Sequence, residues 1–191
     1  MAEVDGAKNW RAKRTLDPRS VGEGSYERRT SLHAVLWICL RSSKPFHAQR
    51  LLEKVKAIAD TGFLVAFGNR KDQHHKWAQA LAERVTEPLL TCEPVLAEAA
   101  FHLNSTALVL AFVRSGLARP AFAVGDHLTR LTELAARYAD RQPDLADLCL
   151  IRMSELYPKF PVITTDVKDF RVYRRGRREA IPFIHPQQRL S

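Results

Sequence analysis

Residues 57–67 decide the fold, and they read AIADTGFLVAF. A short apolar run ends at Asp60, and a longer apolar run begins at Phe63. The first run has the length of a buried strand, which we expect at 55–59, and the second has that of a helix, which we expect at 61–67. Asp60 therefore lies between two buried elements. A carboxylate without a partner there costs several kcal/mol or takes up a proton.

Strands and helices alternate along the rest of the chain. Apolar runs and their spacing predict further strands at 89–92, 121–124, 161–164 and 170–173. They predict further helices at 74–85, 94–103, 106–115, 128–138 and 145–156. This alternation predicts an α/β fold in three layers, with a central parallel sheet of four to five strands flanked by helices.

Positive charge is concentrated at the two ends of the 191-residue chain. Residues 1–54 carry 11 Lys and Arg against 6 Asp and Glu, and residues 175–191 carry 4 against 1, whereas the middle is nearly balanced. We therefore expect a poorly ordered N-terminal extension at 1–54, one folded domain at 55–174 and a basic tail at 175–191. Basic ends suit a polyanionic partner, although a solubilising tail has the same composition.

Composition makes several classes of protein unexpected. No apolar run approaches the roughly 18 residues that a membrane span needs, so we expect neither a span nor a secretory signal. The three cysteines, Cys39, Cys92 and Cys149, are an odd and unpatterned set. They favour a reducing cytoplasm over a disulfide framework or a zinc site.

Three more carboxylates interrupt apolar segments as Asp60 does. Glu98 is the only charged residue in the helix expected at 94–103. Asp147 lies in another apolar helix, and Asp166 follows a strand. A helix cap or a salt bridge would explain any one of them alone, but Lys and Arg lie only at the margins of these segments. A shared Mg²⁺ or Mn²⁺ ion would satisfy all four, because hard divalent cations prefer carboxylate oxygen.

The positions of these acids also favour one shared site. Ligands of parallel α/β sheets bind outside the carboxyl ends of the strands, where Asp60 and Asp166 are expected. Asp144 lies three residues before Asp147, on the same helix face. Asp144 also suits a helix N-cap, and Asp169 suits a turn.

Four segments, in this order and at these separations, make the chain similar to a known family. They are AIADTGFLVAF at 57–67, LTCEPVLAEA at 90–99, DLADL at 144–148 and ITTDVKDFRVYR at 163–174. From Val55 to about Arg174 the chain resembles a PIN-domain ribonuclease, and within that group the VapC-type toxins of bacterial type II toxin–antitoxin systems. The last segment is the most specific.

The resemblance implies a metal-dependent endoribonuclease with the catalytic, metal-binding acids Asp60, Glu98, Asp147 and Asp166. It implies supporting roles for Asp144, Thr165 and Asp169. In this family one or two Mg²⁺ or Mn²⁺ ions activate a water and stabilise charge on the phosphate, which leaves a 5′-phosphate and a free 3′-hydroxyl. The family also implies a cognate antitoxin protein and a homodimer as partners.

The chain departs from the family at a few positions. It has Pro143–Asp144 where Pro-Met-Asp is frequent, and Leu148 where a small residue often follows the third acid. These differences concern packing more than chemistry. Residues 1–54 have no counterpart in the family, so translation from near Val55 would make the extension a mis-assigned start.

A basic segment follows the last of these acids. It contains Tyr173 and five arginines, Arg171, Arg174, Arg175, Arg177 and Arg178. Arginine interleaved with an aromatic residue suits phosphates and unstacked RNA bases, so we predict that these arginines bind the RNA substrate. We interpret His102, four residues after Glu98, as a core histidine rather than as the partner of that acid.

Two other functions are open. A Mg²⁺-dependent phosphoryl-transfer protein would also place acids at strand ends. However, haloacid-dehalogenase phosphatases need an aspartate where this chain has Gly62, and response-regulator receivers need a lysine where it has Asp166. A non-catalytic RNA-binding PIN module would be favoured by the loss of an acid, and all four are present.

Overall fold

The computed structural model of the protein describes residues 56–187. The extension expected at 1–54, the alternative start near Val55 and the last residues of the expected tail, 188–191, lie outside the described residues.

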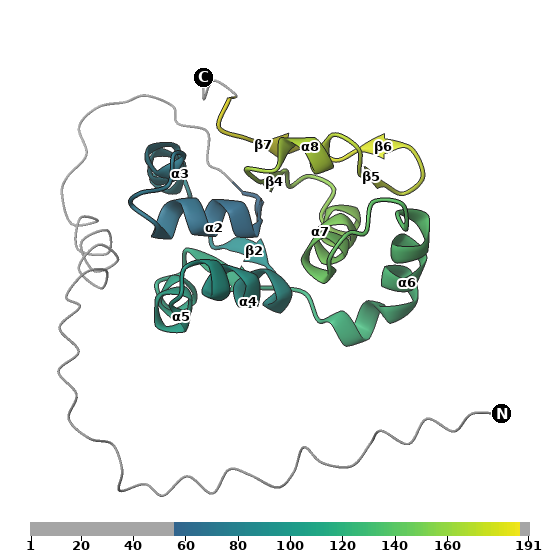
Figure 1. The fold of residues 1–191 in the computed structure, drawn as a ribbon, viewed down its shortest axis with the longest axis horizontal. Helices are drawn as coiled ribbons and strands as arrows, with labels where there is room; N and C mark the ends of the chain where they lie inside the picture. Colours follow the sequence, from purple (N-terminus) through teal and green to yellow (C-terminus); the bar gives the residue numbers. More distant parts are fainter. Residues whose placement is uncertain (1–55, 188–191) are drawn as a thin grey trace, which may run out of the picture. The chain divides into compact units, whose positions relative to one another are not determined.

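A five-stranded parallel sheet forms the middle of the fold (Figure 1). Its strands are β1 (Ile58–Ala59), β2 (Leu89–Thr91), β3 (Ala118–Pro120), β4 (Val162–Ile163) and β7 (Phe183–Ile184). They lie in the order β3-β2-β1-β4-β7. The chain leaves β1 toward β2 on one side and returns to β4 on the other side of β1. The carboxyl ends of β1 and β4 therefore flank a topological switch point, where ligands of such sheets bind.

Helices flank this sheet, and seven α-helices lie within residues 56–187. They are α2 (Thr61–Gly68), α3 (His75–Ala82), α4 (Glu93–His102), α5 (Thr106–Arg114), α6 (Leu128–Arg137), α7 (Leu145–Leu156) and α8 (Val167–Phe170). Helix α2 packs against α3 and α4, α4 also against α5 and α7, and α6 against α7. None of these helices is long and apolar enough to cross a membrane. The predicted three-layer α/β class is confirmed.

Acidic residues begin three of the helices. Asp60 caps α2, Asp144 caps α7 and Asp166 caps α8, and each side chain accepts a backbone N–H group of the helix that it precedes. The free N–H groups and the dipole of a helix N-terminus favour a carboxylate there. The N-cap that we considered for Asp144 is thus present.

The strand expected at 121–124 is wrong. The third strand is β3, which ends at Pro120, and residues Val124–His127 form a 3₁₀ helix, η2. Proline lacks the N–H group that a strand donates to its neighbour, so Pro120 makes residues 118–120 an unexpected strand. Because β3 lies at an edge of the sheet, a missing donor on its outer side is tolerated.

The edge strand expected at 170–173 is also wrong. Asp166 accepts the N–H group of Asp169 (3.0 Å), and this cap starts α8, which runs through Phe170. The edge strand beside β4 is β7, from the segment that we expected to be a tail.

A two-stranded antiparallel hairpin lies between α8 and β7. Its strands are β5 (Arg174–Arg175) and β6 (Glu179–Ala180). Its turn contains Gly176 at a φ of +57°, which glycine adopts without strain. The carboxylate of Glu155 in α7 accepts hydrogen bonds from Arg130, Arg152 and the N–H group of Gly176. This carboxylate ties α6, α7 and the hairpin together.

Candidate active site

One pocket brings together all the acids predicted from the sequence. It has a volume of about 370 Å³ and lies where β1 and β4 end. Its lining includes Asp60, Glu98, Asp144, Asp147, Asp166 and Asp169, together with Thr165. These residues come from four separate parts of the chain, namely the β1–α2 junction, α4, the start of α7, and the segment from the end of β4 through α8. We call this cavity the acidic pocket.

Asp60 is the most deeply buried of these acids, with 8% of its surface exposed. Its Oδ1 accepts the backbone N–H group of Thr61 and its Oδ2 accepts the hydroxyl group of Thr164, both at 2.6 Å. Burial raises the pKa of Asp60 to about 6, although these two hydrogen bonds oppose the rise, and the charges of Glu98 and Asp166 add to it. A bound cation would therefore stabilise the ionised form of Asp60 at neutral pH.

Glu98 faces Asp60 from α4, and Thr61 links the two acids. The Thr61 hydroxyl group donates to Oε2 of Glu98 (2.7 Å). Nε2 of His102 lies 3.6 Å from Oε1 of Glu98, and the His102 side chain is 51% exposed and also lines the acidic pocket. The interpretation of His102 as a core residue is wrong, because the last turn of α4 reaches the rim of the pocket.

Asp147 lies in the first turn of α7, where it is partly buried. Burial, and next the charge of Asp144, raises the pKa of Asp147 to about 7. A hydrogen bond from the Tyr173 hydroxyl group to Oδ2 of Asp147 (3.0 Å) opposes this rise. Asp60 is among the charges that raise the pKa further, so the acids of the pocket influence one another.

The remaining acids form the exposed part of the pocket. Asp166 and Asp144 are both exposed, and each is held by its capping hydrogen bond. Thr165 lies directly against Gly62 of α2, since a Cβ atom added at Gly62 would lie 2.1 Å from the Thr165 hydroxyl oxygen. This glycine lets the β4–α8 junction approach α2 and so brings Asp166 toward the pocket.

The PIN domain family matches residues 57–176 of this chain, which span the acidic pocket and everything between its first and last acid. The chain belongs to the PIN domain family. PIN domains are generally nucleases, and they typically use divalent metal ions. A search of curated proteins found no match.

The donor groups of this PIN domain fit a hard divalent cation. The pocket offers carboxylate oxygens, and within residues 56–187 no Lys or Arg forms an ion pair with Asp60, Glu98, Asp147 or Asp166. Mg²⁺ and Mn²⁺ prefer carboxylate oxygens as ligands, and these carboxylates are not already paired with a Lys or Arg side chain of residues 56–187. In the same part of the chain no three His, Cys, Asp or Glu side chains already form a group that could hold an ion. The acids of the PIN domain would therefore have to draw together around a cation.

The five predicted RNA-binding arginines divide into two groups. Arg174 donates to the backbone carbonyls of Arg171, Val172 and Tyr173, and Arg175 pairs with Glu179. Both are only partly exposed. The other three, Arg171, Arg177 and Arg178, are exposed. None of the five lines the acidic pocket of the PIN domain.

Sequence reasoning missed four residues that hold the acids of the PIN domain. They are Thr61, Gly62, Thr164 and Tyr173. Thr61, Gly62 and Thr164 lie within four residues of a predicted acid, so hydroxyl and small residues at those positions were an available signal. Tyr173 lies 26 residues from Asp147, and its partner follows only from the fold.

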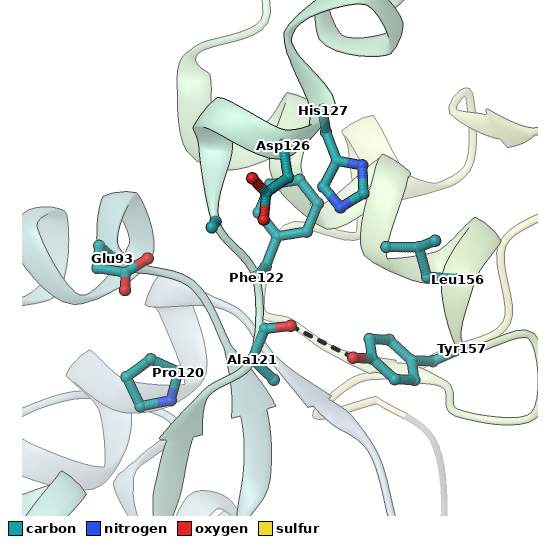
Figure 2. A pocket seen from close by; sticks show the side chains of 9 residues that line it. Glu93, Pro120, Ala121, Phe122, Asp126, His127, Leu156 and Tyr157 are labelled. Carbon is teal, nitrogen blue, oxygen red and sulfur yellow. Dashed lines mark hydrogen bonds between the residues drawn. The ribbon is translucent and has the colours of Figure 1, made fainter.

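A second pocket of the PIN domain, of about 600 Å³, lies beside the end of β3 (Figure 2). Phe122 stacks on His127 there with ring centroids 4.6 Å apart, and the Tyr157 hydroxyl group donates to the carbonyl of Ala121 (3.3 Å). Its lining contains only two acids, Glu93 and Asp126, and none of the predicted site residues. This pocket is therefore less suited to a cation than the acidic pocket.

Proposed function

We propose that this PIN domain is a Mg²⁺- or Mn²⁺-dependent endoribonuclease and that it acts as the VapC-type toxin of a toxin–antitoxin pair. The observation that carries the first part is the acidic pocket. Carboxylates from four separate elements line one cavity, and no Lys or Arg of the described residues pairs with its four main acids. Such an arrangement is costly without a cation, so it is best explained by a function that uses one.

The acids divide into two groups in the proposed reaction. Asp60, Asp147 and Asp166 would hold the cation directly or through water, and Glu98 would bind it or orient the attacking water. The cation, when bound, supplies activation of water and stabilisation of phosphate charge. Thr61 and Thr164 keep the carboxylates of Glu98 and Asp60 in place through their hydroxyl groups. Asp144, Thr165 and Asp169 line the rim in supporting roles.

The proposed reaction is the hydrolysis of a phosphodiester bond of RNA. A water oxygen forms a bond to phosphorus, the bond from phosphorus to the 3′ oxygen breaks, and that oxygen takes up a proton. The products are one fragment with a 5′-phosphate and another with a free 3′-hydroxyl. No histidine is needed as a nucleophile, although His102 lies beside Glu98 at the rim.

The arginines after α8 are the proposed RNA-binding residues. Arg171, Arg177 and Arg178 are exposed and would contact phosphates. Arg174 and Arg175 would act through the structure that they stabilise, because their guanidinium groups bind backbone carbonyls and Glu179.

Exposed apolar side chains support the proposal of protein partners. The largest are Phe101, Leu110, Leu128, Leu145 and Leu156. Exposed apolar side chains mark a protein interface where they form one contiguous patch. A homodimer and a cognate antitoxin that covers the acidic pocket would both use such surface.

The test is RNA cleavage by the purified protein with Mg²⁺, with Mn²⁺ and with EDTA, beside Asp60→Ala. We expect metal-dependent cleavage that is lost in the variant and products that carry a 5′-phosphate. Metal binding without cleavage of any RNA would instead favour a non-catalytic RNA-binding module. Cleavage that survives both EDTA and Asp60→Ala would refute the proposed site.

A further inference from the structure

Tyr173 makes a hydrogen bond that the packing of the core does not require. It is 2% exposed, and it lies between α8 and the hairpin. Phenylalanine would fill the same volume, so burial explains the ring but not its hydroxyl group. That hydroxyl group donates to Oδ2 of Asp147 across 3.0 Å.

The ring of Tyr173 is fixed from several sides. Phe170 and Tyr138 meet it edge to face, with centroids 5.8 Å and 5.2 Å away. The backbone N–H group of Tyr173 donates to the carbonyl of Asp169 (3.0 Å). A hydroxyl group on a ring held in this way is a fixed donor, and it therefore selects one orientation of the carboxylate that accepts from it.

Little else holds the carboxylate of Asp147. Within residues 56–187 it has no Lys or Arg partner, and Tyr173 is its one hydrogen-bond donor. Oδ2 accepts from Tyr173, and Oδ1 accepts no hydrogen bond from any other described residue, although Asp147 lines the acidic pocket. The Thr164 hydroxyl group holds Oδ2 of Asp60 in the same manner. Neutral donors behind the carboxylates are thus a repeated feature of this pocket.

We propose that Tyr173 is a positioning residue of the cation site, which orients the Asp147 carboxylate before the ion arrives. This inference rests on the proposed function, because it assumes that the acidic pocket binds Mg²⁺ or Mn²⁺. Groups that hydrogen-bond to metal ligands typically change metal affinity by about 10-fold to 100-fold when they are removed. Tyr173 touches no substrate in this role and acts only through Asp147.

The test compares Tyr173→Phe with Tyr138→Phe. Tyr138 is a matched control, because it is also buried, it packs against the same ring, and its hydroxyl group binds the backbone of Arg174 and not an acid. Mn²⁺ affinity is measured by calorimetry on the metal-free proteins, and thermal unfolding without metal reports stability separately. We expect Tyr173→Phe to weaken Mn²⁺ binding by about 10-fold or more. Tyr138→Phe should change it less than about 2-fold.

A near-ultraviolet difference spectrum of the unmodified protein gives a second readout that needs no variant to fold. Mn²⁺ binding should perturb tyrosine absorbance, since the ion withdraws charge from the carboxylate that Tyr173 contacts, and the signal should vanish in Tyr173→Phe. An unchanged spectrum at saturating Mn²⁺ would overturn the inference, as would equal Mn²⁺ affinities of Tyr173→Phe and wild type. A wild-type protein that binds no Mn²⁺ overturns the proposed function as well, so the two failures are distinguishable.

Discussion

The hydroxyl group of Thr164 donates a 2.6 Å hydrogen bond to Oδ2 of Asp60, although 104 residues separate them in sequence. This contact joins the residues that directly follow β1 and β4, and Asp60 lines the acidic pocket. Thr164 itself is fully buried. The charge of Asp60 is therefore stabilised only by neutral hydrogen-bond donors in a buried site. These donors offset only part of the free-energy cost of removing the carboxylate from water, and a bound cation would offset the rest.

Asp60→Asn should stabilise the metal-free protein relative to wild type as the pH rises. The folded pKa of Asp60 is about 6, above its ordinary value of 3.8. The folded protein thus holds a proton that the unfolded chain releases, and this contribution to stability is lost as the pH rises from about 4 to about 6. Asparagine cannot ionise, so the difference in unfolding free energy should move in its favour by on the order of 2 kcal/mol between pH 4 and pH 7.

Urea unfolding in EDTA at both pH values measures this difference. Asp140→Asn is the control, because the Asp140 side chain is 77% exposed. Asp60→Asn should also lack nuclease activity, which would make Asp60 a residue that function retains at the expense of stability. A difference that does not vary with pH would contradict the argument.

Gly62→Ala should damage the pocket without altering any polar group. The new Cβ atom would lie 2.1 Å from the Thr165 hydroxyl oxygen and 3.2 Å from its backbone nitrogen. The junction that carries Asp166 must then shift, which we expect to cost about 1–3 kcal/mol despite the better helix propensity of alanine. Gly125→Ala is the matched control, since nothing lies within 4 Å of its added Cβ atom. The unfolding free energy from chemical denaturation and the Mn²⁺ affinity should both fall in Gly62→Ala. Both should be unchanged in Gly125→Ala.

Glu155→Gln should destabilise the protein at neutral pH, and the effect should fade in acid. Burial alone would raise the pKa of Glu155, but hydrogen bonds from Arg130, Arg152 and the N–H group of Gly176 lower it to about 2. A lowered pKa contributes stability above the ordinary value of about 4.5 and loses it as the pH falls toward 2.

We expect Glu155→Gln to cost about 2 kcal/mol at pH 7 and much less at pH 2.5. Glu133→Gln removes another partner of Arg130, but the Glu133 side chain is 57% exposed, so its cost should stay below about 1 kcal/mol. Thermal unfolding at the two pH values distinguishes them. Equal losses of stability in both variants would show that Glu155 contributes no more than an exposed partner of Arg130, in spite of its position at the junction of α6, α7 and the hairpin.

Much of this architecture follows from sequence because hydrophobic periodicity and strand-end acids are local signals. The helix expected at 145–156 coincides with α7, and the four main acids line one pocket as their positions at strand and helix ends predict. Short strands are harder, since β3 holds a proline that is tolerated only at an edge, and edge position is a property of the whole sheet.

Pairings between residues far apart in sequence could not be predicted in the same way. The edge strand β7 pairs with β4 in spite of its polar surroundings, because α8 and the hairpin return the chain to the sheet. Similarly, the donor to Asp147 is Tyr173, although its place among the arginines favours an RNA-stacking role. The structure buries this ring, so it cannot stack on a base as it stands.

Replacing Arg171, Arg177 and Arg178 together with alanine should weaken RNA binding and flatten its dependence on salt. These side chains are exposed, and each arginine that no longer neutralises a phosphate of single-stranded RNA should reduce the slope of log affinity against log salt by about 0.7. Arg174→Ala is the contrasting variant, because its guanidinium group binds three backbone carbonyls at the end of α8. That variant should lower the unfolding temperature more than the triple variant does and change the salt slope less. Fluorescence anisotropy with a single-stranded RNA, measured in Ca²⁺ or EDTA to prevent cleavage, gives the slope. An unchanged slope in the triple variant would assign RNA binding to another surface of the protein.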